Sequence, residues 1–433
     1  MSGDSTTIKK ERGNKFAISA LLCALVALAG AYKPAVSLGS IEIRAFEFVV
    51  VFSLAFLWPL LLKIIHWNRH YSVIILFLIS LLVSASINSS SDAVVLCVKV
   101  FVAVIVFFVV VQSISLFPEI CSKAHAWWVF GAAVIAALGI AAYFLAMTGF
   151  VERTFIYATA FGYRIVSLLP DPNRFADYTG IIASFVAGGI FVERKIRLKS
   201  IVILMYFLLA LILSGSRGAM LSFVAACLIG FVVVVFIAFM PFNKGAVNFS
   251  ISKRFFAVFI ALAILIAAII STPGGKKVFG RFTGASVKQE DRLESNMRVA
   301  AAIVTINNMS QADLTRLIFG VAQYEKVNLG SREVNHHNTY LSILGAMGFS
   351  GLLIFVSLIL MFLAGNISVL KKTFSQSGNQ LRSLAAGHVF ALIFIMLHLM
   401  FIDLLHTGYV WIFYGLAAST IAAGKFQQAE EPR

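Results

Sequence analysis

Residues 93–116 read AVVLCVKVFVAVIVFFVVVQSISL, a long and almost entirely apolar run. Its single charged residue is Lys99, which lies near one end. About twenty apolar residues in a helix cross the hydrocarbon core of a bilayer. Residues 93–116 are therefore predicted to form a transmembrane helix.

Similar apolar runs recur along the 433 residues. They predict an all-α protein, a polytopic transmembrane helical bundle of about twelve spans. The predicted spans are 16–34, 45–65, 71–88, 93–116, 126–149, 175–192, 200–214, 218–240, 255–272, 338–364, 383–402 and 406–424. Three regions follow: nine spans in 1–272, an extramembrane loop at 273–336, and three spans with a tail in 337–433.

The composition supports a membrane protein. The chain is 60% hydrophobic and 12% charged, whereas about a quarter of the residues of a soluble domain are charged. The net charge of +16 does not indicate a nucleic-acid partner, because the basic residues lie mostly in short segments between apolar runs. The four cysteines have no metal-ligand spacing and are interpreted as packing residues.

The distribution of Lys and Arg predicts the orientation. With the N-terminus inside, the cytoplasmic segments hold 19 of these residues and the short outer loops hold 6. Both termini are therefore expected in the cytoplasm. The long loop 273–336 is then periplasmic, and its periodicity predicts amphipathic helices at 291–307 and 313–323 rather than strands.

Several polar motifs fall at the predicted outer face. Ser214-Gly215-Ser216-Arg217-Gly218 joins two spans; its arginine is either a snorkelling charge at a helix end or part of an anion site. Asp171-Pro172-Asn173-Arg174 has the residues of a turn and a helix start.

Two further motifs contain histidine. His336-His337-Asn338-Thr339-Tyr340 opens the tenth span, where the histidines are either interfacial residues, a general base or, least favoured, metal ligands. Asp403 and His406 are a possible acid–base pair, but a local structural hydrogen bond or a hydrated hairpin tip is the preferred interpretation.

Together these segments resemble the O-antigen ligase and polymerase superfamily of bacterial envelopes. The resemblance spans roughly 170–355 and rests on the order, spacing and common sidedness of its motifs. The motifs are the DPN segment at 171–173, the SGSRG turn at 214–218, Arg298 in a loop helix followed by LIFGV at 317–321, and HNTYL at 337–341 leading into Gly345, Gly348 and Gly351.

The resemblance implies a glycosyltransferase at the periplasmic face of a Gram-negative inner membrane. The donor is a polysaccharide on undecaprenyl diphosphate, the acceptor is a sugar hydroxyl of lipid A–core, and no nucleotide or metal cofactor is expected. A single large loop favours the ligase over the polymerase; a protein oligosaccharyltransferase of the same superfamily and a lipid-linked glycan transporter are the remaining alternatives. Span centres are almost uncharged, which argues against the transporter.

The resemblance also suggests roles for individual residues. With no metal expected, arginines are predicted to neutralise the diphosphate, and a histidine is predicted to deprotonate the acceptor. The predicted base is His337. The predicted diphosphate ligands are Arg217 and Arg298, helped by Arg164 and Arg174. Further candidate binding residues are Ser216, Asn173, His336, Asn338 and Tyr340.

Overall fold

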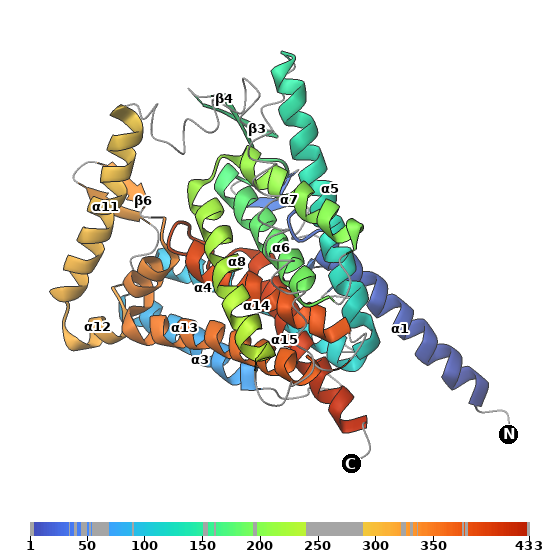
Figure 1. Ribbon diagram of the computed structural model, residues 1–433. Helices are drawn as coiled ribbons and strands as arrows, with labels where there is room; N and C mark the ends of the chain where they lie inside the picture. The colour runs from blue at the N-terminus through green and yellow to red at the C-terminus, as the bar shows by residue number, and fades with distance from the viewer. Residues whose placement is uncertain are drawn as a thin grey trace.

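The computed structural model in Figure 1 confirms an all-α helical bundle. It describes residues 4–33, 35–38, 41–44, 50–51, 53, 69–88, 91–149, 155–159, 162–193, 197–239, 289–321, 326–329, 332–335, 337–374, 376 and 380–430. The predicted spans 45–65 (apart from 50–51 and 53) and 255–272 lie outside these residues.

The other ten predicted spans each overlap a helix, although α1 ends at Ala27, before the predicted end of the first span at 34. Among the described helices, seven are long and apolar enough to cross a membrane, and the span count of twelve stays a prediction. The helices are α1 (Asp4–Ala27), α3 (Arg69–Asn88), α4 (Ser91–Leu116), η1 (Pro118–Ile120), α5 (Cys121–Met147), α6 (Pro172–Val192), α7 (Leu198–Ser214), α8 (Arg217–Ala238), α11 (Gln289–Ser310), α12 (Leu314–Phe319), α13 (Thr339–Thr373), α14 (Gln380–His398) and α15 (Gly408–Glu430).

Helices α6 and α14 form the centre of the bundle. In their most apolar 18-residue segments, 94% of α6 and 78% of α14 is buried. They pack closely because glycines face each other: a Cβ on Gly188 would lie 3.0 Å from the Gly387 Cα atom and 2.4 Å from the Ala386 carbonyl oxygen. Outer helices instead expose large apolar side chains, as Val98 and Phe101 do on α4, which suits contact with lipid.

In the part of the chain that the structure describes, three short antiparallel hairpins accompany the helices. They are β1 (Ala35–Leu38) with β2 (Ile41–Arg44), β3 (Ile156–Thr159) with β4 (Gly162–Ile165), and β5 (Lys326–Leu329) with β6 (Arg332–Asn335). The last of these corrects the expectation of helices alone in the 273–336 loop. Gly330-Ser331, between two strands that pair Val327 with Val334, is a hairpin turn signal, and helical periodicity does not detect such a signal.

The helical prediction for the same loop is otherwise confirmed by α11 and α12. α12 packs on α13 at a kink, where Gly348 has φ +66 and interrupts the helical backbone. A Cβ on Gly348 would lie 2.4 Å from the Ile318 carbonyl oxygen, and the Val321 amide donates to the Gly345 carbonyl at 2.9 Å. The LIFGV segment and the glycines of α13 are thus two parts of one contact.

We expect Gly348→Ala to destabilise the protein by about 2 kcal/mol or more, because alanine is strained at this positive φ and its methyl group meets backbone. Thermal unfolding of the detergent-purified protein measures the loss. Gly149→Ala is the matched control, since Gly149 has φ +96 but a Cβ added there would meet no neighbouring atom within 4 Å. Equal losses in the two variants would show that backbone strain alone accounts for the effect and that the close approach of α12 to Gly348 adds nothing to it.

Candidate functional site

Arg164 on β4 joins two of the predicted site motifs. Its Nε donates to the Ser214 carbonyl oxygen at 2.7 Å, and its Nη2 donates to Asn173 Oδ1 at 2.9 Å. The guanidinium therefore connects the end of α7 with the start of α6. These two bonds give Arg164 a positioning role, holding the DPN and SGSRG segments side by side.

The DPN segment begins α6 as the sequence predicted. Asp171 is the N-cap, and its carboxylate accepts from the amides of Asn173 at 2.8 Å and Arg174 at 3.1 Å. Pro172 occupies the first helical position, where no amide hydrogen is needed. Arg174 Nε also lies 3.5 Å from Asp171 Oδ2, so this arginine is held beside its own helix cap.

The SGSRG segment is a tight turn between α7 and α8. Gly215, with φ +66, ends α7, and Ser216 is the buried N-cap of α8. Arg217 is the first residue of α8 and is exposed. The positive end of the α8 dipole and the guanidinium thus lie together, an arrangement that attracts anions.

The HNTY segment begins α13. His337 is half-buried and has a left-handed backbone, with φ +47. Asn338 is the N-cap, and its side chain accepts from the Leu341 amide at 3.1 Å. The Tyr340 hydroxyl donates to the Met396 carbonyl at 2.7 Å. Both Asn338 and Tyr340 therefore have structural contacts, whereas the strained backbone of His337 is typical of functional sites.

The turn at 399–407, between α14 and α15, contacts both the α8 and the α13 starts. The Thr339 amide donates to the carbonyls of Leu399 at 2.9 Å and Ile402 at 3.1 Å. On the other side, a Cβ on Gly218 would lie 2.8 Å from the Phe401 ring. Gly218 follows Arg217, and Thr339 lies two residues after His337. Both Gly218 and Thr339 contact the same short turn, although Arg217 and His337 are distant in sequence.

The side chains of two predicted site residues lie outside the part of the chain that the structure describes. Arg298 is in α11, which contacts β5, β6 and α13, but its side chain lies outside the described residues. His336 is also outside them. That Arg298 and Arg217 lie close enough to bind the same diphosphate stays a prediction.

Asp403 takes part in a structural hydrogen-bond network. It is 4% exposed, and its carboxylate accepts from the Ser342 hydroxyl and from the Leu405 amide at 3.3 Å. These contacts are structural, whereas the interpretation of Asp403 and His406 as a pair stays a prediction.

A buried polar cluster below Arg174 was missed by the sequence analysis. Asp177 Oδ1 lies 2.7 Å from His398 Nδ1, and Asp177 Oδ2 accepts from the Tyr409 hydroxyl at 3.0 Å. None of the three side chains is more than 1% exposed. The cluster joins α6, α14 and α15 one turn below the start of α6. The sequence signal that could have predicted this cluster is the presence of an acid and a histidine inside separate apolar runs.

We expect Asp177→Ala to destabilise the protein by about 3–5 kcal/mol, because it removes the buried partner of His398 Nδ1 and leaves the Tyr409 hydroxyl with only its longer bond to the Arg174 carbonyl. Thermal unfolding in detergent measures this. Asp171→Ala, which removes a partly exposed carboxylate from the same helix, should cost only about 1 kcal/mol. If the two variants lost the same stability, the buried cluster would not be an anchor for these helices.

The fold and these polar helix ends define an integral membrane protein with a cation-rich site at one end of its bundle. Residues 202–356 match the family model described as O-antigen ligase. The matched segment runs from α7 into α13 and so includes the SGSRG turn, α11, α12 and the HNTY segment. The match over these residues supports the O-antigen ligase superfamily that the motifs resemble. None of the curated proteins matches the chain.

Proposed function

We propose that this protein is an O-antigen ligase, a glycosyltransferase acting at the periplasmic membrane face. It transfers a polysaccharide from undecaprenyl diphosphate to a sugar hydroxyl of lipid A–core. The observation that carries the proposal is the O-antigen ligase match over 202–356, which includes the starts of α8 and α13, both in contact with the 399–407 turn. The site residues have the roles expected from the sequence, except that Arg164 positions the α7–α8 turn instead of binding the diphosphate.

In the proposed reaction His337 accepts the proton of the acceptor hydroxyl. The hydroxyl oxygen attacks the anomeric carbon of the donor sugar while the bond from that carbon to the diphosphate oxygen breaks. A direct displacement inverts the anomeric centre, and undecaprenyl diphosphate leaves with the electron pair. General-base assistance of this kind typically contributes about a hundred- to ten-thousandfold.

The leaving diphosphate needs positive charge as the bond breaks. Arg217 is the main proposed ligand, because it is exposed and stands at a helix N-terminus. Arg298 is the second proposed ligand. Arg164 binds the Ser214 carbonyl and the Asn173 side chain, so it supports the site by positioning the α7–α8 turn. Arg174, held beside Asp171, is a helper in the same region.

A reconstitution with competing acceptors tests the proposal. The full chain in proteoliposomes receives lipid-linked glycan together with lipid A–core and a second lipid-linked repeat unit. We expect transfer to lipid A–core alone. Elongation of the lipid-linked glycan would instead identify a polymerase, and lipid movement across the bilayer without transfer would identify a transporter.

A further inference from the structure

A large pocket lies at the end of the bundle opposite the candidate site. Its volume is about 1090 Å³, and it lies among the starts of α5, α7 and α14 and the end of α6. Helices α6 and α7 reach the candidate site at their other ends, at Pro172 and Ser214. Since α6 has 21 residues, the two sites are about 30 Å apart along the helix axis.

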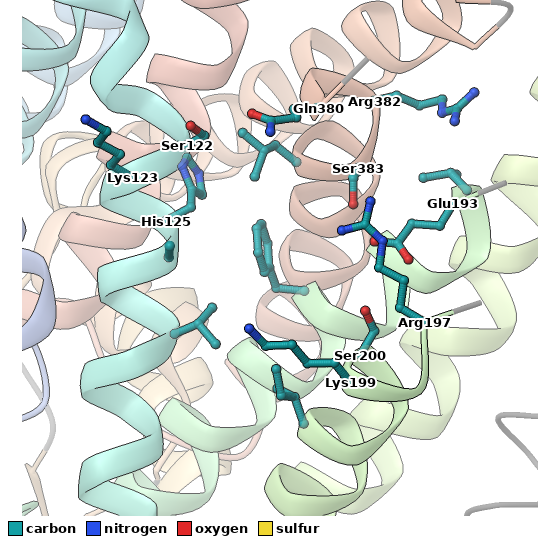
Figure 2. Close-up of a pocket in the computed structure, with 16 residues that line it drawn as sticks. Ser122, Lys123, His125, Glu193, Arg197, Lys199, Ser200, Gln380, Arg382 and Ser383 are labelled. Atoms are coloured by element: carbon teal, nitrogen blue, oxygen red, sulfur yellow. The ribbon is translucent and has the colours of Figure 1, made fainter. Parts of the chain in front are cut away.

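The pocket has a strongly cationic lining. Lys123, Arg197, Lys199 and Arg382 line it, against the single carboxylate of Glu193. Figure 2 shows that these cations come from opposite walls, with Lys199 extending from α7 toward α5. Arg197 and Lys199 reach into the space between α5, α7 and α14, whereas Lys123 and Arg382 line the pocket with their charged ends turned outward.

Arg382 has a fixed position in this lining. It is 8% exposed, and its Nη1 donates to the carbonyls of Phe374 at 3.0 Å and Gln376 at 3.3 Å. Arg197 and Lys199, in contrast, are exposed and begin α7. The first turns of α7 and α14 add the positive ends of two helix dipoles to the same space. Anions are thus favoured by side chains and backbone together.

The rest of the lining combines hydroxyl and apolar groups. Ser122, Ser200 and Ser383 provide hydroxyls from three helices. Val129, Phe185 and Ile203 form apolar parts of the wall. A pocket with both characters, at the ends of membrane helices, suits an amphiphile better than a small hydrated anion.

We propose that this pocket binds the phosphodiester headgroup of an anionic membrane phospholipid. Arg197 and Lys199 contact the phosphate, the serine hydroxyls bind polar groups of the head, and the apolar wall receives the first part of an acyl chain. The site is separate from glycosyl transfer and does not rest on the proposed function.

Lipid binding to the detergent-purified full chain tests the proposal, with native mass spectrometry as the readout. The probes are dioleoyl phosphatidylglycerol, dioleoyl phosphatidylcholine and inorganic phosphate as competitor. The test variant is Arg197→Gln with Lys199→Gln. The matched control is Arg69→Gln with Lys425→Gln, which loses the same charge from exposed residues that do not line the pocket.

We expect the wild-type protein to retain phosphatidylglycerol in preference to phosphatidylcholine. The pocket variant should bind phosphatidylglycerol at least tenfold more weakly, while the control variant binds as the wild type does. Equal losses in both variants would overturn the proposal, because net charge alone would then explain binding. Displacement of the lipid by millimolar inorganic phosphate would overturn it as well, since the pocket would then be a small-anion site. Thermal unfolding of both variants shows that each is folded.

Discussion

His337→Ala should lower glycan transfer to lipid A–core by about a hundred- to ten-thousandfold, because the proposed reaction loses its general base. Transfer is measured in proteoliposomes as the shift of lipid A–core to polysaccharide-bearing species on a gel. The Asn338 cap and the bonds between Thr339 and the 399–407 turn hold the start of α13 without using the imidazole. The loss of activity should therefore exceed any loss of folded protein.

The backbone at His337 calls for a second variant. At φ +47 alanine is less well accommodated than asparagine. His337→Asn keeps a residue suited to this conformation and removes the base, so it should be folded like the wild type and as inactive as His337→Ala. Full activity in His337→Asn would exclude a base role. Full activity in His337→Ala with loss in His336→Ala would move the role to the neighbouring histidine.

Arg217→Ala should lower transfer by about a hundred- to a thousandfold, which corresponds to roughly 3–4 kcal/mol of transition-state stabilisation. The arginine is proposed to bind the leaving diphosphate in a bidentate manner, and its exposure means that its removal disturbs little packing. Arg217→Lys should recover only part of the activity, because an ammonium group restores the charge without the planar fork. The same proteoliposome assay measures both variants.

Arg69→Ala is a suitable control for Arg217→Ala, since Arg69 is an exposed arginine at the first turn of α3, distant in sequence from the site motifs. It should keep wild-type activity. If Arg217→Ala stayed within about threefold of wild type, Arg217 would be a helix-end charge and not a diphosphate ligand.

The sequence predicted most helices because long apolar runs have a simple physical meaning in a membrane. It also predicted the start of α6, where Asp171 and Pro172 suit the cap and first position of a helix. The order of the SGSRG, LIFGV and HNTY motifs indicated the superfamily. These features are local or depend only on order along the chain, so no three-dimensional information was needed.

Contacts between distant segments could not be obtained in this way. Nothing in the sequence around Arg164 indicates that its guanidinium binds Ser214 and Asn173. Asp177, His398 and Tyr409 likewise belong to three different helices and form no motif. These side chains pair because of how the three helices pack. That packing depends on the whole fold and not on any local sequence motif.

The 399–407 turn has a practical consequence for work on this protein. A short connection between two membrane helices is an obvious place to insert an epitope tag for determining sidedness. Here Thr339 donates hydrogen bonds to the backbone of the turn, and Gly218 contacts it at Phe401. An inserted tag would report the side of the membrane correctly while separating the starts of α8 and α13. A tag fused after α15 avoids this damage, because Figure 1 places the C-terminus at the far end of that helix.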